Sequence, residues 1–312
     1  MKNGTEVSEF FLLGFSTLGD LRNVIFILLL LVHIMTLLGN LLIIFIVAST
    51  HHIHTPMYLF LVQLSLSDMV LTINIGPKML HVILANGSLI SYSSCICQLY
   101  FFGLPTIFEC FLLSSMSYDR YLAVCNPLRY QSVMDIRLQT HLILWPWFLG
   151  FTIPLMTVIS VSSLEFCKQN IIDHFFCDLP PLLRLSCSDT SVVELEMLVA
   201  SMPILPVPCL LILVTYSYIA VTVLKISSAT GRQKAFSTCS SHLIVVCTYY
   251  GTLLTLYLVP SGKHLTNINK TLSLLYTVGT PMCNPLIYTL RNQENMVSLV
   301  KFISKIRSGE VV

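Results

Sequence analysis

The chain has 312 residues, of which 55% are hydrophobic and only 10% are Asp, Glu, Lys or Arg. A soluble globular protein carries about 25% charged residues, so this composition excludes a cytosolic enzyme and a disordered chain. The apolar residues are gathered in long runs, which is typical of membrane helices. The sequence therefore predicts an integral membrane protein.

Seven stretches are long and apolar enough to cross a bilayer, for which a helix needs about 20 residues. None of the short alternating segments of a membrane β-barrel appears. The expected spans are 24–48, 57–82, 93–124, 138–162, 195–224, 235–260 and 270–290. We expect an all-α membrane protein: a seven-transmembrane helix bundle over 24–291, preceded by a tail over 1–23. A short amphipathic helix and tail follow over 292–312.

Loop composition predicts the orientation. Most Lys and Arg residues fall on the cytoplasmic side when the N-terminus is placed outside, in accord with the positive-inside rule. The polar stretch from Met1 to Ser8 offers no cleavable signal peptide, so the first span is expected to insert as its own signal. Asn3 begins a glycosylation sequon on the outer tail, whereas Asn86 and Asn269 begin sequons close to helix ends. We expect a multi-pass plasma-membrane protein with an extracellular N-terminus, glycosylated at Asn3.

Only two formal charges lie inside the expected spans, Asp68 in the second and Glu109 in the third. A charged side chain at the bilayer centre costs at least about 2.5 kcal/mol, so each carboxylate is a functional hypothesis. Asn40 and Asn284 offer polar partners, and a cation shared by the two acids, such as Na⁺, would explain both. A protonated acid that makes only structural hydrogen bonds is the alternative. Arg120 follows Glu109 by almost three helical turns, so the two residues share one face.

Several motifs recur in a fixed order along the whole chain. The third span ends in Asp119-Arg120-Tyr121, within the string 116–127. The others are Gly39-Asn40, Thr55-Pro56-Met57-Tyr58, Leu66-Ser67-Asp68, 234–243, 281–288 and Leu290-Arg291-Asn292. This ordered set resembles the olfactory (odorant) receptors, a branch of the rhodopsin-like G-protein-coupled receptors. The segment 11–15 is similar to the tetrapod-type (class II) members, and Ser117 and His52 depart from the family pattern.

The resemblance implies an activation switch, whose residues are Asp119, Arg120, Tyr121, Tyr216, Asn284, Pro285 and Tyr288. At rest Asp119 holds Arg120, and activation releases Arg120 toward Tyr216 and a G protein. A proline lacks a backbone donor, so Pro285 weakens the seventh span and permits a bend. The resemblance also makes the cluster around Asp68 a sodium or water site that links the ligand pocket to this switch.

Five of the eleven cysteines are expected near the outer face: Cys95, Cys97, Cys167, Cys177 and Cys187. The last three fall in the only long loop, which needs covalent ties because it has no core of its own. Spacing does not determine the connectivity. The resemblance implies Cys95–Cys177 and Cys167–Cys187, which leaves Cys97 unpaired. The segment 173–178 is expected to form a lid over the pocket, and a metal site of His174 with the free thiol is the less favoured reading.

The outer half of the bundle is expected to hold the ligand, between helices and beneath the long loop. The expected lining is Phe102, Gly103, Thr106, Ala200, Ser201, Ile204, Tyr250, Leu253, Leu254 and Tyr257. Ordinary packing between helices is the alternative for each of them. Amine receptors carry Asp where this chain has Phe102, and visual pigments carry a Schiff-base Lys where it has Val278. The remaining pocket suits a small, volatile, neutral molecule held by dispersion and one or two hydrogen bonds.

The cytoplasmic face is basic between the fifth and sixth spans, where Lys225, Arg232 and Lys234 lie. The resemblance implies that a stimulatory G protein binds this face and raises cAMP. Membrane lipid is a further expected partner, whereas no cofactor and no nucleic acid are expected. A channel or transporter that uses Asp68 and Glu109 as an ion path predicts broken helices or repeated halves, which the sequence lacks. A membrane enzyme would need a catalytic set that the spans do not contain.

Overall fold

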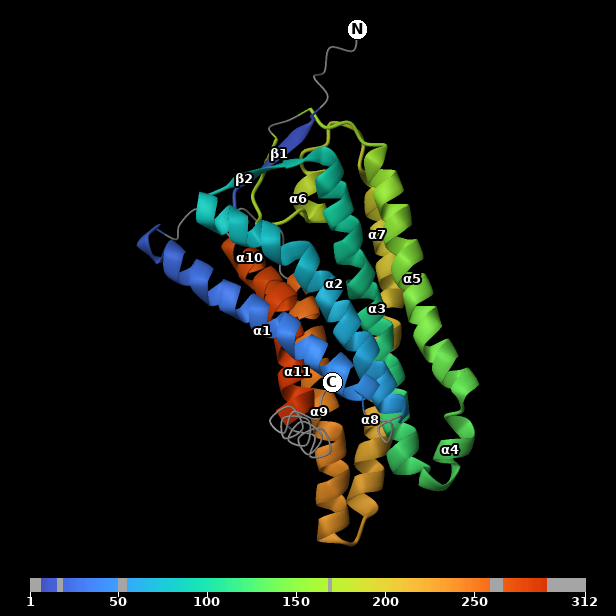
Figure 1. Ribbon diagram of the computed structural model, residues 1–312. Coiled ribbons are helices and arrows are strands. Elements are labelled where there is room, and N and C mark those ends of the chain that lie inside the picture. The colour runs from blue at the N-terminus through green and yellow to red at the C-terminus, as the bar shows by residue number, and fades with distance from the viewer. Residues whose placement is uncertain (1–6, 16–18, 50–54, 168–169, 259–265, 291–312) are drawn as a thin grey trace.

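The computed structural model describes residues 7–15, 19–49, 55–167, 170–258 and 266–290. These residues are mostly helical, and the long helices form a bundle that carries a small sheet at one end (Figure 1). The short helix α4 (Tyr130–Val133) lies at the opposite end. Asn3 and the amphipathic helix expected over 292–312 lie outside the described residues.

The bundle is built from helices that follow the expected spans in order. They are α1 (Arg22–Ser49), α2 (Pro56–Ala85), α3 (Tyr92–Cys125), α5 (Ile136–Ser162), α7 (Ser191–Ile204), α8 (Pro206–Lys225), α9 (Ala229–Leu258), α10 (Thr266–Leu274), the π-helical turn η5 (Leu275–Gly279) and α11 (Thr280–Leu290). The connections contain α4, α6 (Leu179–Leu183) and the 3₁₀ turns η1 (Gly19–Leu21) and η3 (Pro127–Arg129).

Within the described residues, five helical segments are long and apolar enough to cross a membrane. They are Gly19–Ser49, Pro56–Ala85, Tyr92–Cys125, Ile136–Ser162 and Ser191–Lys225, and they cover the first five expected spans. The sixth expected stretch falls on α9, and the seventh falls on α10, η5 and α11. Large apolar side chains such as Leu28, Trp145 and Leu213 are exposed, as expected of surfaces that contact lipid.

The fifth span differs from the single helix expected over 195–224, because it is divided at Leu205 into α7 and α8. Pro206 and Pro208 have no backbone N–H, so two hydrogen bonds of a continuous helix are missing here. Pro206 occupies the first turn of α8, where an N–H would have no partner within the helix. The division is slight, since the N–H of Leu205 still donates to the oxygen of Ser201 at 3.1 Å.

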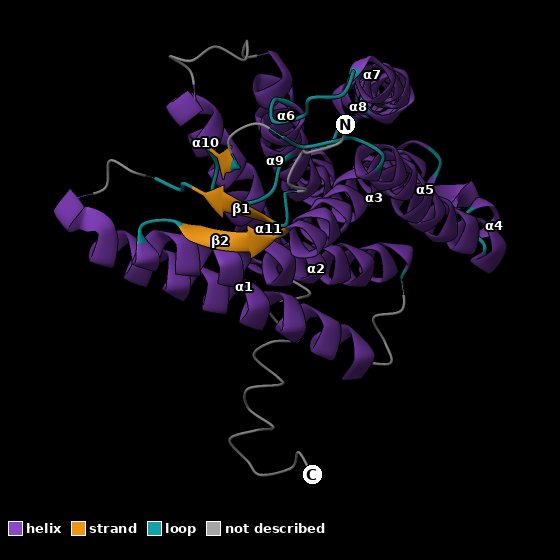
Figure 2. Ribbon diagram, turned by 90° about the horizontal axis from the view of Figure 1, so that it is seen from above, coloured by secondary structure: helices purple, strands orange, loops and turns teal. Residues whose placement is uncertain are grey.

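A three-stranded sheet covers one end of the bundle, where only a tail was expected over 1–23 (Figure 2). The central strand β1 (Glu9–Leu12) pairs antiparallel with β2 (Ser88–Ser91) and parallel with β3 (Ile171–Ile172). Phe10 and Leu12 are fully buried beneath it. We call residues 7–15, 86–91, 163–167 and 170–190 the sheet layer. Strands this short are too brief to show an alternating pattern in the sequence.

The motif Gly39-Asn40 has a packing role in this bundle. A Cβ at Gly39 would lie 3.1 Å from the ring of Pro285, a tight contact, so glycine at this position favours the close approach of α1 to α11. The neighbouring Asn40 side chain donates to the backbone oxygen of Pro281 at 3.3 Å. These contacts join α1 and α11 at the depth of Asp68 and Glu109.

Candidate ligand site and polar switch network

Aromatic rings surround one threonine beneath the sheet layer, in an arrangement that we call the aromatic cluster: Phe102, Thr106, Tyr249 and Tyr276. The hydroxyl of Tyr276 donates to Thr106 Oγ1 at 3.0 Å, and the hydroxyl of Tyr249 donates to the backbone oxygen of Thr106 at 2.6 Å. The ring of Tyr276 lies edge-on to Phe102 and to Tyr249, with centroids 6.1 and 5.7 Å apart. Thr106 thus connects α3 with α9 and η5.

The segment 173–178 lies against this cluster. The ring of Phe176 packs on Phe102 with centroids 5.0 Å apart, and Phe175 stacks on Phe15 at 5.4 Å. Phe175 and Phe176 are both fully buried. The side-chain oxygen of Gln98 accepts the backbone N–H of Cys177 at 2.9 Å, which fixes the segment to α3.

Two disulfides tie the sheet layer to the bundle and to itself. Cys95 of α3 is bonded to Cys177, with their Cα atoms 5.4 Å apart. Cys167 is bonded to Cys187 within the loop between α5 and α7, with a Cα separation of 5.9 Å. These are the pairs that the resemblance implies. Cys97 is free and exposed.

A partly buried ion pair also supports the sheet layer. The ammonium group of Lys270, whose side chain is nearly inaccessible, donates to the oxygen of Gly14 at 2.7 Å and pairs with the Asp173 carboxylate. Burial, with the charge of Lys270 as a smaller cause, lowers the pKa of His174 to about 3. Burial raises the pKa of Asp178 to about 6, opposed by the N–H of Leu179. Among the described residues no group of three or more His, Cys, Asp or Glu side chains is placed to hold a metal ion.

Deeper in the bundle the two acids make separate hydrogen bonds. The amide of Asn284 donates to both carboxylate oxygens of Asp68, at 3.1 and 3.0 Å. The hydroxyl of Ser67 donates to Glu109 at 2.9 Å. Both acids are almost completely buried, and the amide oxygens of Asn40 and Asn284 have no hydrogen-bond partner among the described residues. We call Asn40, Ser67, Asp68, Glu109 and Asn284 the acid cluster; its free oxygens are ligands of the kind that hard cations prefer.

At the α4 end, Arg120 and Asp119 form an ion pair with an N–O distance of 3.1 Å. The hydroxyl of Tyr130, in α4, donates to the other oxygen of the Asp119 carboxylate at 2.7 Å. Because Asp119 is fully buried, these two contacts compensate its charge. The hydrogen bond from Tyr130 holds the carboxylate in the orientation that binds Arg120.

A second set of contacts at this end joins α3, α8 and α9. Nε2 of His242 lies 3.1 Å from the backbone oxygen of Leu113, and Nδ1 lies 2.7 Å from the hydroxyl of Tyr216. A backbone oxygen only accepts, so Nε2 carries the proton and Nδ1 accepts the proton of the tyrosine hydroxyl. A neutral His242 therefore bridges the three helices.

The sequence matches the olfactory receptor family model over residues 29–305. It is similar to the human olfactory receptor 10A5, at 43% identity over 97% of this chain and 96% of that protein. Mouse olfactory receptor 1M1 is 44% identical over 97% of each chain, and human olfactory receptor 11L1 is 43% identical over 94% of this chain and 91% of its own. The chain belongs to the olfactory receptor family. It is accordingly a transmembrane G-protein-coupled receptor of olfaction and not an enzyme.

The structure of this olfactory receptor brings some of the expected pocket residues together and separates others. Tyr250 and Leu253 are buried on the inward side of α9, where the hydroxyl of Tyr250 donates to the oxygen of Cys110 at 2.8 Å. Leu254 is 38% exposed, because it lies about 100° around the helix from Leu253 and falls outside the buried face. Gly103 lies against Pro154 of α5, away from the partners of Thr106.

The expected lining from α7 is only partly buried. Ala200 and Ser201 are half-buried, and the hydroxyl of Ser201 donates to Leu198 within its own helix at 2.9 Å. Ile204 packs against the central apolar core. The side chain of Tyr257 lies outside the described part of the chain.

Four polar residues of these networks were missed from the sequence. Tyr249 and Tyr276 lie within apolar spans, where their hydroxyl groups could have indicated hydrogen bonds between helices. His242 lies in the motif 234–243 and interrupts a helix that is otherwise suited to the membrane interior. The contact of Tyr130 with Asp119 had no signal, because it depends on how the chain turns between α3 and α4.

Proposed function

We propose that this olfactory receptor is a seven-helix plasma-membrane protein whose sheet layer and N-terminus face the exterior. The α9 helix and the α10–η5–α11 segment complete seven spans with the five apolar ones, so that 1–23 is an extracellular tail, 24–291 the bundle and 292–312 a cytoplasmic helix and tail. Two observations support this orientation: disulfides form in oxidising surroundings, and both lie in the sheet layer. The basic link around Lys225 lies at the opposite end.

The proposed ligand is a small, volatile, neutral molecule bound at the aromatic cluster together with Tyr250 and Leu253. The observation that carries this proposal is the cluster itself: rings surround Thr106, and its side chain and those of its neighbours carry no charge. A ligand hydroxyl or carbonyl replaces or joins the hydrogen bond between Tyr276 and Thr106, while its apolar part contacts the rings. Binding is weak because a small ligand has few atoms with which to make contacts.

The proposed signal passes from this site to the α4 end along α3 and α9. Thr106 lies one turn before Glu109, so a shift of α9 or η5 relative to α3 also changes the surroundings of the acid cluster. Movement of α9 separates His242 from its partners and releases Arg120 from Asp119, which opens the α4 end to a stimulatory G protein and raises cAMP. The acid cluster holds a sodium ion or water in the resting state. The ligand shifts this equilibrium only by its difference in affinity for the two states.

A cAMP assay with a stimulatory G protein and a panel of neutral odorants tests this proposal. We expect concentration-dependent cAMP signals that Arg120→Ala abolishes without loss of surface expression. Tyr276→Phe is expected to weaken responses to alcohols about fivefold, the effect of one lost hydrogen bond, and to leave responses to hydrocarbons unchanged. The control Tyr218→Phe changes an exposed tyrosine of α8 and has no effect. Ion currents without any cAMP response would refute the proposal.

A further inference from the structure

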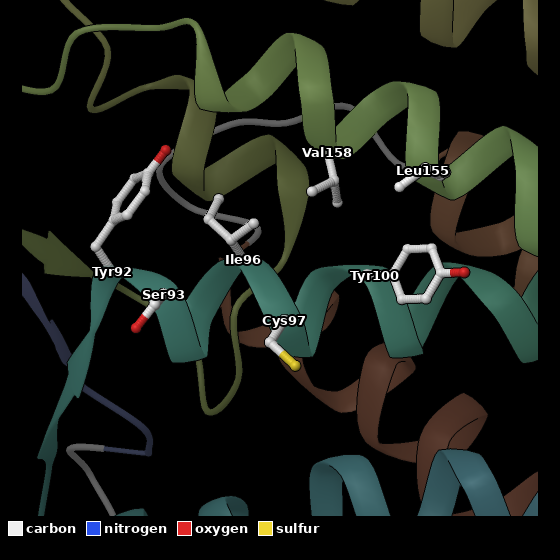
Figure 3. A pocket seen from close by; sticks show the side chains of 7 residues that line it. All are labelled: Tyr92, Ser93, Ile96, Cys97, Tyr100, Leu155 and Val158. Atoms are coloured by element: carbon white, nitrogen blue, oxygen red, sulfur yellow. The ribbon is translucent and has the colours of Figure 1, made fainter.

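A groove separate from the aromatic cluster lies between α3 and α5, next to the sheet layer (Figure 3). Its volume is about 400 Å³, within the range of small-molecule sites. The residues that line it are Tyr92, Ser93, Ile96, Cys97, Tyr100, Leu155 and Val158. None of these belongs to the ligand site or to the polar network described above.

The position of the groove follows from how α3 and α5 pack. A Cβ at Gly103 would lie 3.0 Å from Cβ of Pro154, and one at Gly150 would lie 3.0 Å from the backbone oxygen of Leu104. The helices are therefore closest at these small residues. All lining residues lie on the sheet-layer side of that contact, where the space between the two helices is not filled by the protein.

The accessible surface of the groove is almost wholly apolar. At the first turn of α3 the hydroxyl of Tyr92 points toward α5, whereas that of Ser93 points away from it (Figure 3). Farther along the groove, Leu155 and Val158 project from α5 toward α3, and Ile96 points back toward α5 (Figure 3). Such a site favours a molecule with one polar head and an apolar chain. No lining residue carries a formal charge, so an ionic head group would lose its hydration without a partner.

Exposed apolar side chains of α5 lie beside the groove. Phe151, Met156 and Ile159 lie beside it on that helix and are 47%, 64% and 59% exposed. In a membrane protein, large apolar side chains with this exposure contact the hydrocarbon of the bilayer. A molecule dissolved in the bilayer therefore reaches the groove without passing through the sheet layer.

We propose that this groove binds a neutral, odorant-sized alcohol dissolved in the bilayer, at a second site independent of the aromatic cluster. The alcohol hydroxyl faces the hydroxyl of Tyr92, and the alkyl chain lies along Ile96, Leu155 and Val158. The helix rise from Tyr92 to Tyr100 is about 12 Å, which is close to the extended length of decanol.

The free thiol of Cys97 at the edge of the groove provides a direct test. The full chain is placed in phosphatidylcholine nanodiscs and treated with N-ethylmaleimide, and mass spectrometry follows alkylation of the Cys97 peptide. At ten times its dissociation constant, decanol slows this reaction about tenfold, because few sites remain empty. Cys247 of α9 is also free and exposed, lies outside the groove and keeps its rate. Decanoate, with a charged head on a chain of the same length, gives no protection.

Matched variants test whether decanol protects Cys97 by binding in the groove. Val158→Trp fills the groove and removes the effect of decanol, whereas Ile159→Trp, one residue along and outside the lining, retains it. Tyr92→Phe removes only the hydroxyl of this ring and weakens the apparent decanol affinity about fivefold by the loss of one hydrogen bond. The readout is alkylation and not cAMP, so its outcome does not depend on odorant signalling.

Three results would overturn the proposal. Equal slowing at Cys97 and Cys247 would show a general effect of the alcohol on the bilayer. Protection that survives both Val158→Trp and Tyr92→Phe would place decanol elsewhere. A Cys97 that reacts only after lipid has been removed would identify a bound phospholipid as the occupant.

Discussion

The two ends of the bundle are stabilised by different kinds of interaction. The sheet layer has a three-stranded sheet and is anchored by two disulfides and by the partly buried pair of Lys270 with Asp173. The α4 end relies on single side-chain contacts, in which Tyr130 and Arg120 meet Asp119 and Tyr216 meets His242. Covalent bonds and a strand ladder persist during signalling, whereas single hydrogen bonds can break and re-form. The sheet layer is thus a fixed frame, and the α4 end is the part that can rearrange.

Energetics explains why this division suits a weakly bound ligand. Moving a two-state equilibrium from 1:99 to 99:1 requires a difference in binding free energy of about 5.5 kcal/mol. A hydrogen bond to a charged group contributes about 1.5–3 kcal/mol, and a neutral one about 0.5–1.5 kcal/mol. A small ligand can therefore change the few contacts of the α4 end, but not the whole sheet layer.

The largest effect is expected from breaking the sheet layer at its link to α3. Replacing both Cys95 and Cys177 by Ser should lower the free energy of unfolding by about 2–5 kcal/mol, the usual cost of losing a native disulfide. Thermal unfolding in nanodiscs, followed by tryptophan fluorescence, measures this loss. Cys97→Ser, in the same turn of α3, should change the midpoint little because Cys97 is free and exposed. Equal shifts for the two variants would show that the disulfide is not the source of rigidity.

A smaller effect of a different kind is expected at the α4 end. Tyr130→Phe removes the hydroxyl that holds Asp119, at a cost of about 1.5–3 kcal/mol to the resting arrangement. Since the freed carboxylate holds Arg120 less firmly, basal cAMP should rise, and the free energy of unfolding should fall by no more than this amount. The control is Tyr118→Phe, on the helix that carries Asp119 but without a hydrogen bond to this carboxylate among the described contacts. A fall in basal signal would mean that the contact supports the active state instead.

The smallest expected effect is a pH dependence of the sheet layer that arises at His174. In the unfolded chain this group binds a proton near its ordinary pKa of 6.5, whereas burial holds its folded pKa near 3. Stability should therefore fall as the pH drops through this window. Asp178 has the opposite effect between about pH 6 and pH 3.8, because its carboxylate takes up a proton at a higher pH in the folded protein than in the unfolded chain. It therefore offsets part of the loss of stability.

His174→Asn tests the sign of this pH dependence. The variant should reverse the trend between pH 6 and 4, because only Asp178 then remains to respond among these two groups. The midpoint of thermal unfolding across this range is the measurement. An unchanged pH profile would show that His174 is already accessible to protons in the folded protein.

The sequence was most informative about residue types that are rare inside a membrane. Asp68 and Glu109 were identified because a charge inside a span is costly, and the structure places both in the bundle interior. The sheet was not predicted, because β1 has four residues and its partners lie in distant loops. Gly103 was assigned to the pocket by its neighbours, but helical rotation places it against α5. Contacts such as Tyr130 with Asp119 depend on loop geometry, which periodicity cannot supply.

Hydrogen–deuterium exchange with and without an activating odorant tests the comparison of the two ends most directly. We predict faster exchange at α4 and at the adjoining ends of α8 and α9 when the odorant is bound. The peptides of β1 and β2 should exchange at the same slow rate in both states. A change confined to the sheet layer, with the α4 end unaltered, would contradict the division into a fixed frame and a part that rearranges.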